Sequence, residues 1–217
     1  MTSGLRLSTK LLLPAILLIS PLVSAAPAPE HAAALVRSLA RPVPAQTAYT
    51  EVRFIGLLTR PLVLRGEMAW LGGDRLTRSV VSPYPETTAI NGDQATIQRG
   101  TAAPRHFSLD HAPELRDLLD AFVALLSGNA PALERSFELQ AYGNAAAWTL
   151  DLVPRNARIG KRIRAISIDG RGTAMRCMRV DQGDGDTSFT LMGALGSVAL
   201  PAKPTPAALV RLCAGAG

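Results

Sequence analysis

An alternation of apolar and polar residues from Thr47 onward is the feature that most limits how this chain can fold. Val52, Phe54 and Leu58 alternate with other residues, and the same period of two continues through residues 62–70. A strand places successive side chains on opposite faces, so this period predicts strands with one apolar face. Tight turns rich in glycine and in asparagine or aspartate are expected at residues 72–74, 91–93 and 183–186. Turns of this kind join antiparallel neighbours, so we predict an antiparallel sheet.

Segments with helical periodicity precede and interrupt the strands. The spacing predicts a helix over residues 30–40, another from Pro113 to Ser127, and one or two turns over residues 129–135. Strands are expected to resume at residues 137–142, 147–153, 162–169, 174–181 and 187–192. This order predicts an α+β fold that is mainly β, in which an incomplete antiparallel β-barrel is covered by a helical lid.

One face of these strands is predicted to line the inside of the barrel. The apolar residues assigned to that face are Phe54, Leu58, Leu64, Met68, Trp70, Leu76, Val80, Ile90, Ile97, Phe137, Leu139, Trp148, Leu150, Ile166, Ile168, Met178 and Leu191. All of them except Ile97, Ile168 and Leu191 are candidates for a hydrophobic ligand cavity. The sequence leaves open whether this interior is hollow or is an ordinary filled core.

Two further groups of residues are assigned by their position around the barrel. The helix at residues 113–127 is apolar over more than one narrow stripe, so its Leu118, Leu119, Phe122 and Leu126 are expected to form the lid. Arg75 and Arg78 lie beside the first hairpins and are expected at the rim of the pocket. There they would meet an acidic partner protein or an anionic head group. Arg53 and Arg65 are expected on the face opposite the apolar one.

The N-terminus indicates export from the cytoplasm. Arg6 and Lys10 precede an apolar run over residues 11–23, and Val23-Ser24-Ala25 supplies the small residues of a cleavage site. The run is too short to cross a bilayer core of about 30 Å comfortably. We therefore predict a signal peptide over residues 1–25, one domain over residues 26–200, a C-terminal tail over residues 201–217, and a periplasmic location.

The charge balance and the two cysteines fit an exported protein. The net charge of the whole chain is +6, and removing Arg6 and Lys10 with the signal leaves +4. Such a protein is expected to meet anionic lipid or an acidic protein rather than nucleic acid. Cys177 and Cys213 could form a disulfide in an oxidising compartment, or they could remain as two unpaired thiols. No cysteine spacing typical of metal binding occurs, and no cofactor is expected.

A cluster of polar residues before the central helix contains the side-chain types of a hydrolytic site. His106, Ser108, Asp110 and His111 are close in sequence, but neighbours in an extended segment rarely reach the geometry of a catalytic triad. There is no GxSxG motif, and the histidines lack the partners of a zinc site. We expect no enzymatic activity and interpret the cluster as the polar approach to Pro113.

Several short segments resemble the LolA-like periplasmic carriers of outer-membrane lipoproteins. They are Phe54 before a hairpin, residues 64–70, residues 75–78, Pro83, residues 90–93 and residues 148–154. The resemblance implies an open β-barrel with a helical lid that carries the acyl chains of lipoproteins between membranes, and it brings no catalytic residue. The family usually has Arg-Pro, an aromatic residue and Arg-Trp where this chain has Arg75-Leu76-Thr77-Arg78. This departure indicates a divergent member with a narrower cargo, such as a glycolipid or an acyl or polyene ester.

Two functions of different classes remain open at the level of sequence. The first is a monomeric carrier of lipoprotein or lipid cargo that contacts membrane surfaces transiently, with an inner-membrane donor and an outer-membrane acceptor. The second is an exported envelope-assembly protein that binds another protein through an apolar face and carries no lipid. Saturable binding of a hydrophobic dye, displaced by fatty acid, would distinguish a hollow pocket from a filled core.

Overall fold

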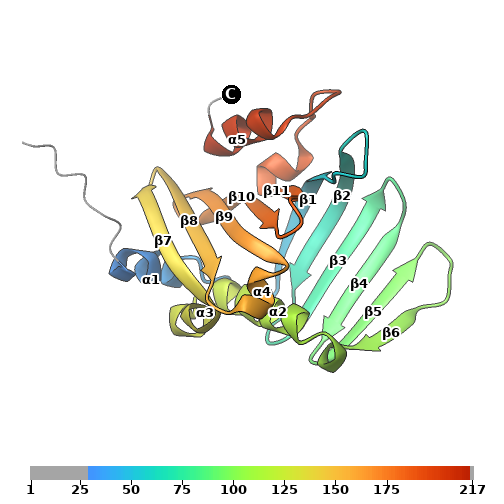
Figure 1. Cartoon of the computed structure of the whole chain (residues 1–217), viewed down its shortest axis with the longest axis horizontal. Coiled ribbons are helices and arrows are strands. Elements are labelled where there is room, and N and C mark those ends of the chain that lie inside the picture. The colour runs from blue at the N-terminus through green and yellow to red at the C-terminus, as the bar shows by residue number, and fades with distance from the viewer. Residues whose placement is uncertain (1–28, 216–217) are drawn as a thin grey trace, which may run out of the picture.

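The computed structural model describes residues 29–215, which form one open antiparallel sheet with helices on both of its faces (Figure 1). The predicted signal peptide at residues 1–25 lies outside the described residues. The first group of strands is β1 (Ala45–Phe54), β2 (Leu62–Trp70), β3 (Arg75–Ser82), β4 (Glu86–Asn91), β5 (Gln94–Arg99) and β6 (Arg105–Ser108). The second group is β7 (Phe137–Asn144), β8 (Ala147–Pro154), β9 (Ile163–Arg171), β10 (Ala174–Gln182) and β11 (Thr187–Met192).

The eleven strands follow the order β6-β5-β4-β3-β2-β1-β11-β10-β9-β8-β7. Two meanders are therefore joined where β1 pairs with β11, and β6 and β7 are left as the two edges. The sheet is strongly curved but does not close (Figure 1). This arrangement confirms the predicted incomplete antiparallel barrel. Strand β6 was not predicted, because its polar residues lack the apolar alternation that identified the other strands.

The helices begin and end where the sequence chemistry requires. They are α1 (Pro29–Ser38), α2 (Pro113–Leu126), α3 (Ala130–Ser136), α4 (Ala157–Gly160) and α5 (Pro206–Ala214), with short 3₁₀ turns η1 (Leu109–His111) and η2 (Gly193–Ser197). The Asn129 side chain accepts a hydrogen bond from the Ala132 amide and caps α3. Thr205 caps α5 in the same way through Ala208, and Gly215 ends that helix with a φ of 80°. None of the helices within residues 29–215 combines the length and apolar character needed to span a bilayer.

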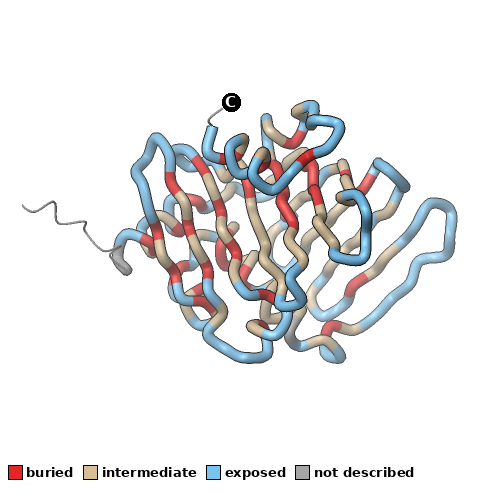
Figure 2. Tube along the Cα trace, turned by 45° about the horizontal axis from the view of Figure 1, so that its top comes forward, coloured by how far each residue is buried: buried red, intermediate tan, exposed pale blue. Residues whose placement is uncertain are grey.

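The main hydrophobic core lies inside the curved sheet, against its second half. Apolar residues of β7 to β10 pack there on α1, α2 and α3, and Figure 2 shows buried positions concentrated along these strands. Among the largest fully buried side chains are Leu39, which directly follows α1, Leu133 of α3 and Phe137 of β7. The helices therefore fill one half of the open barrel.

A second, smaller core lies on the outer face of the sheet. Val52, Phe189 and Leu191 pack there against Leu209 and Cys213 of α5. The prediction that Leu191 faces inward is therefore wrong, because α5 and η2 cover the outer face of β1 and β11 and give apolar side chains a second place to be buried.

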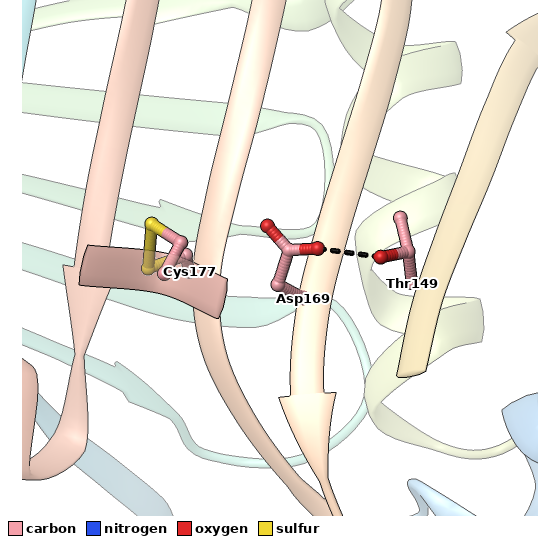
Figure 3. The surroundings of a disulfide bond; sticks show 4 residues. Thr149, Asp169 and Cys177 are labelled. Atoms are coloured by element: carbon pink, nitrogen blue, oxygen red, sulfur yellow. Dashed lines mark hydrogen bonds between the residues drawn. A yellow bond between two sulfur atoms is a disulfide. The ribbon is translucent and has the colours of Figure 1, made fainter. Parts of the chain in front are cut away.

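Cys177 of β10 is joined by a disulfide to Cys213 of α5 (Figure 3). The two Cα atoms are 5.6 Å apart, a separation usual for disulfides. The bond fastens α5 to the outer face of the sheet. On the neighbouring strands β8 and β9, Thr149 donates a hydrogen bond to Asp169 at 2.7 Å. Of the two alternatives that the sequence left open, the structure contains the bridge.

Gly66 is a point where two strands approach too closely for any side chain. A Cβ atom at this position would lie 1.7 Å from the carbonyl oxygen of Ser79 on β3. We expect Gly66→Ala to lower the free energy of unfolding by about 1–3 kcal/mol, because β2 and β3 must separate. Urea denaturation measures this change. Gly160→Ala is the control, since its Cβ would meet no atom within 4 Å; equal stability of the two variants would contradict the prediction.

Candidate functional site

A cavity of about 570 Å³ lies between the curved sheet and α2. Its walls come from the inner faces of β1 to β4, from β9 to β11, and from α2. The large apolar side chains that line it are Met68, Trp70, Leu76, Ile90, Ile168, Met175, Met178 and Met192 on strands, and Leu119, Phe122, Leu125 and Leu126 on α2. The half of the barrel that α1 and α3 do not fill is thus hollow.

Alternation along β2 to β4 explains how the sequence directs these side chains inward. The register places Met68 opposite Arg78, Trp70 opposite Leu76, and Leu76 opposite Ile90. Directly opposed residues of antiparallel strands project from the same face, so these rows continue across the sheet. Trp70 is held in place because its indole N–H donates to the carbonyl of Gly73 at 2.8 Å.

The structure brings five of the fourteen candidate cavity residues to the cavity wall: Met68, Trp70, Leu76, Ile90 and Met178. Five others share the inner face but belong to the filled core: Phe137, Leu139, Trp148, Leu150 and Ile166. Helices cover that half of the sheet. The alternation within a strand shows which residues share a face, but it does not show that helices fill the space beside that face. Leu64 and Val80 are buried in the same inward rows, opposite Glu51 and Gly66, and do not line the cavity.

Two candidate cavity residues were wrongly assigned. Phe54 lies on the outer face, where its ring makes an edge-to-face contact with Phe189 at 6.1 Å between centroids. Leu58 lies in the loop after β1 and is exposed. The alternation along β1 was read in the wrong phase, because both faces of this strand are covered and its apolar side chains pack beneath α5.

Helix α2 supplies three of the four predicted lid residues to the cavity. Leu119, Phe122 and Leu126 line it, whereas Leu118 lies over a much smaller space beside Phe137. On its other side α2 is anchored in the main core through buried Ala121 and Ala124. The helix thus forms one wall of the cavity while remaining part of the fold.

The arginines are not arranged as the alternation suggested. Arg53, expected opposite the apolar face, lines the cavity, and so does Arg78. Arg65 is on the outer face, where it donates to Thr50 Oγ1 at 3.0 Å. Arg75 lies outside the cavity, because its guanidinium donates to the carbonyl of Leu71 at 2.8 Å in the β2–β3 turn. The predicted rim pair is therefore split, with Arg78 inside the cavity.

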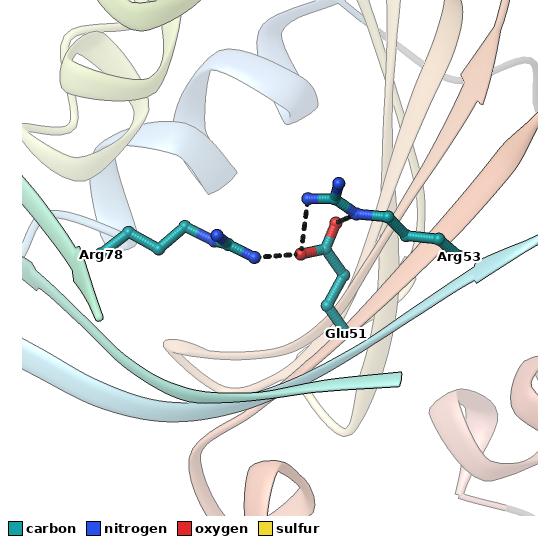
Figure 4. Close-up of polar contacts among 3 residues, drawn as sticks. All are labelled: Glu51, Arg53 and Arg78. Carbon is teal, nitrogen blue, oxygen red and sulfur yellow. Dashed lines mark hydrogen bonds and ion pairs between the residues drawn. The ribbon is translucent and has the colours of Figure 1, made fainter. Parts of the chain in front are cut away.

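Glu51 connects Arg53 and Arg78 in a charged cluster on the cavity wall (Figure 4). Arg53 donates to both carboxylate oxygens of Glu51, at 2.7 and 3.1 Å, and Arg78 donates to Oε2 at 2.6 Å. Burial disfavours the charged form of Arg53, but the hydrogen bonds and charge of Glu51 outweigh it and raise the pKa of Arg53. Arg53 therefore keeps its positive charge.

Tyr49 completes this cluster. Its ring lies under the guanidinium of Arg78, 5.0 Å from the centroid. Its hydroxyl is buried and makes no hydrogen bond within the described part of the chain. Burial raises the pKa of Tyr49 and outweighs the opposing effect of Arg78, so the phenol keeps its proton at neutral pH.

Sequence reasoning missed this cluster. Tyr49, Glu51 and Arg53 are at alternate positions of β1, so they share one face of the strand. One signal in the sequence could have identified a polar site inside the barrel. Glu51 has an aromatic residue two positions before it and a basic residue two positions after it, and Arg78 lies two strands away.

Helix α2 also carries an acidic residue with a perturbed pKa. Desolvation and, to a smaller degree, the negative charge of Asp74 raise the pKa of Asp120. Asp74 lies in the turn between β2 and β3. The ionised forms of the two carboxylates thus repel each other between the helix and the first hairpin.

The polar cluster before α2 makes structural contacts. His106 Nδ1 is 3.0 Å from Thr96 Oγ1, Ser108 accepts from the amide of Asp110, and Asp110 forms an ion pair with Arg116 at 3.3 Å. In the region from residue 29 to residue 215, no group of three or more histidine, cysteine or acidic side chains could hold a metal ion.

A family model described as outer membrane lipoprotein carrier protein LolA-like matches residues 24–216. The chain belongs to this LolA-like family. The match spans the open sheet, α2 and α5, so the family pattern includes the C-terminal helix as well as the cavity. A comparison with curated proteins found no match.

Solved structures similar to this chain were also found. The LolA superfamily protein NE2245 from Nitrosomonas europaea is 8% identical, with a TM-score of 0.41, over 79% of this chain and 94% of that one. A DUF1329 family protein from Desulfovibrio piger is 10% identical, with a TM-score of 0.42, over 80% and 93%. A putative outer membrane lipoprotein-sorting protein domain from Vibrio parahaemolyticus is 7% identical, with a TM-score of 0.41, over 85% and 98%.

Proposed function

We propose that this LolA-like protein is a periplasmic carrier that shields the acyl chains of a lipoprotein or lipid-like cargo during transfer from the inner to the outer membrane. The observation that supports this most directly is the cavity of about 570 Å³ between the open sheet and α2, with its largely apolar wall. Its volume is within the range of about 300–1,000 Å³ that is usual for small-molecule sites. Membership of the lipoprotein carrier family supports the same function.

The energetics of apolar transfer fit this role. Each methylene removed from water contributes about 0.8 kcal/mol, so a chain of about a dozen methylenes gains on the order of 10 kcal/mol as an upper limit. Four methionines, Met68, Met175, Met178 and Met192, supply flexible and polarizable surface that adapts to chains of varied shape. The cavity can thus hold an acyl chain without specific polar contacts along its length.

Loading and release require that one wall of the cavity moves, and α2 is the wall best suited to do so. Ala112 precedes α2 and offers no side-chain hydrogen bond to its first amides. The cavity-facing residues Leu119 and Phe122 are only partly buried. The function therefore includes a lid movement of α2, with a donor at the inner membrane and an acceptor at the outer membrane driving transfer in one direction.

The two tryptophans of the chain provide a direct test. Trp70 lines the cavity, whereas Trp148 is buried in the filled core. Titration with dodecanol, an uncharged amphiphile, should change tryptophan emission saturably in the wild type and in Trp148→Phe, because an apolar chain would displace water near Trp70. The Trp70→Phe variant should lose this change in emission, although calorimetry should still detect its binding of dodecanol.

Two other results of the dodecanol titration would contradict parts of this proposal. Absence of saturable dodecanol binding in the wild-type protein would contradict the carrier function and favour the envelope-assembly protein that binds through an apolar face. A response lost in Trp148→Phe but kept in Trp70→Phe would place the apolar ligand in the other half of the barrel.

A further inference from the structure

We propose that the cavity selects cargo by an anionic head group, a carboxylate or a phosphate, which binds to Arg53 and Arg78 while the apolar chain occupies the rest of the cavity. This inference rests on the proposed carrier function and specifies the chemical class of the cargo.

The cavity wall carries an excess of positive charge. The charged residues that line it are Arg41, Glu51, Arg53 and Arg78, so three cations face one anion. Around Glu51 alone, two guanidinium groups share a single carboxylate. Withdrawing unbalanced charge from water is costly, and an added anion would offset that cost. A neutral cargo would leave the excess positive charge facing its acyl chain.

The two cations of the cluster are more accessible to a ligand than its carboxylate. The side chains of Arg53 and Arg78 are 38% and 24% exposed, whereas that of Glu51 is 11% exposed. The carboxylate lies between the two guanidinium groups, binds both, and is the least exposed of the three charged groups (Figure 4). A ligand that enters the cavity would meet the cations first.

Hydrogen-bond donors of the cluster remain available to a ligand. Arg78 uses Nη2 for Glu51, and among the described residues its Nε and Nη1 have no hydrogen-bond partner. The hydroxyl of Tyr49, a residue only 1% exposed, also lacks a partner within the described chain. Buried polar groups normally find partners, and a bound carboxylate or phosphate would satisfy guanidinium and phenol donors together.

The test compares three probes that share one alkyl chain: dodecanoate, dodecyl phosphate and dodecanol. Calorimetry at pH 8 and low salt should show at least one anionic probe binding about tenfold or more tightly than dodecanol, the gain expected of a charge-assisted hydrogen bond. Tighter binding of dodecanoate would identify a carboxylate cargo, and tighter binding of dodecyl phosphate a phosphate cargo. Equal binding of all three probes would overturn the inference.

Substitutions in the charged cluster test whether it causes the preference for anionic probes. Arg78→Met and Arg53→Met should each lower the affinity for the anionic probe far more than the affinity for dodecanol, and saturable dodecanol binding by each variant shows that its cavity is folded. Glu51→Gln should strengthen anion binding several-fold, because it removes the competing carboxylate. Arg65→Met, on the outer face, is the matched control and should retain the wild-type preference.

The outcomes separate this inference from the carrier function. If dodecanol binds but both arginine variants keep the anion preference, the head-group site is wrong and the carrier function remains. Should either arginine variant fail to fold, the response of Glu51→Gln decides, and unchanged or weaker anion binding there would overturn the site. If no probe binds to the wild-type protein, the carrier function itself is contradicted.

Discussion

Ile90→Glu is expected to weaken dodecanol binding by at least about 30-fold, because it places a carboxylate in the wall against which the alkyl chain packs, and removing that carboxylate from water costs about 2 kcal/mol or more. Ile90 lines the cavity, and its cross-strand neighbours on that face are Leu76 and Ala95, which cannot pair with a charge. The side chain is partly buried, so in the absence of ligand the new carboxylate can be hydrated from the cavity and the fold can persist.

The emission of Trp70 on titration with dodecanol measures this loss, and circular dichroism checks that the variant is folded. Val81→Glu is the matched control: Val81 lies on the neighbouring strand β3 and is 69% exposed, so binding should be unchanged. A folded Ile90→Glu protein that binds dodecanol as tightly as the parent would show that the ligand lies elsewhere.

Removal of the disulfide is expected to lower the free energy of unfolding by about 4 kcal/mol. The bond closes a loop with a sequence separation of 36 residues, and in the chain-entropy account a loop of that length restricts the unfolded state by about this amount. Such a loss is large beside the total of about 5–15 kcal/mol that is usual for a domain. Release of α5 would also uncover Val52 and Leu191 on the outer face.

Urea denaturation of the double variant Cys177→Ser, Cys213→Ser measures this effect, and the wild-type protein under reducing conditions should match it. The bond is on the opposite face of the sheet from the cavity, so the folded double variant should retain dodecanol binding. An unchanged urea midpoint after reduction would contradict the prediction.

The elements that the sequence predicted well are those with strong local periodicity. The strand at Thr187–Met192 was predicted with its observed ends, and α2 was predicted to within one residue. The start of α3 at Asn129 and the glycine turns were predicted reliably because their chemistry is local. Strand β6 was missed because an edge strand, paired on one side only, needs no apolar alternation.

The candidate site was predicted only in part, because a strand has two faces and the sequence does not say what covers each. In β2 to β4, Met68, Trp70, Leu76 and Ile90 were assigned correctly to the cavity wall. In β1 the apolar Val52 and Phe54 belong to the outer core, which exists because α5 is fastened there.

Local patterning thus determined the antiparallel meanders, the helices and the possibility of a disulfide, since periodicity, caps and turns depend on neighbours in the chain. Only the tertiary structure decided which half of the barrel is filled and which is hollow, because that depends on where α1 and α3 pack. It also decided that Glu51 meets Arg53 and Arg78 inside the cavity. The contact with Arg78 joins β1 to β3 across the intervening β2, and these strands come within reach of each other only after the sheet has formed.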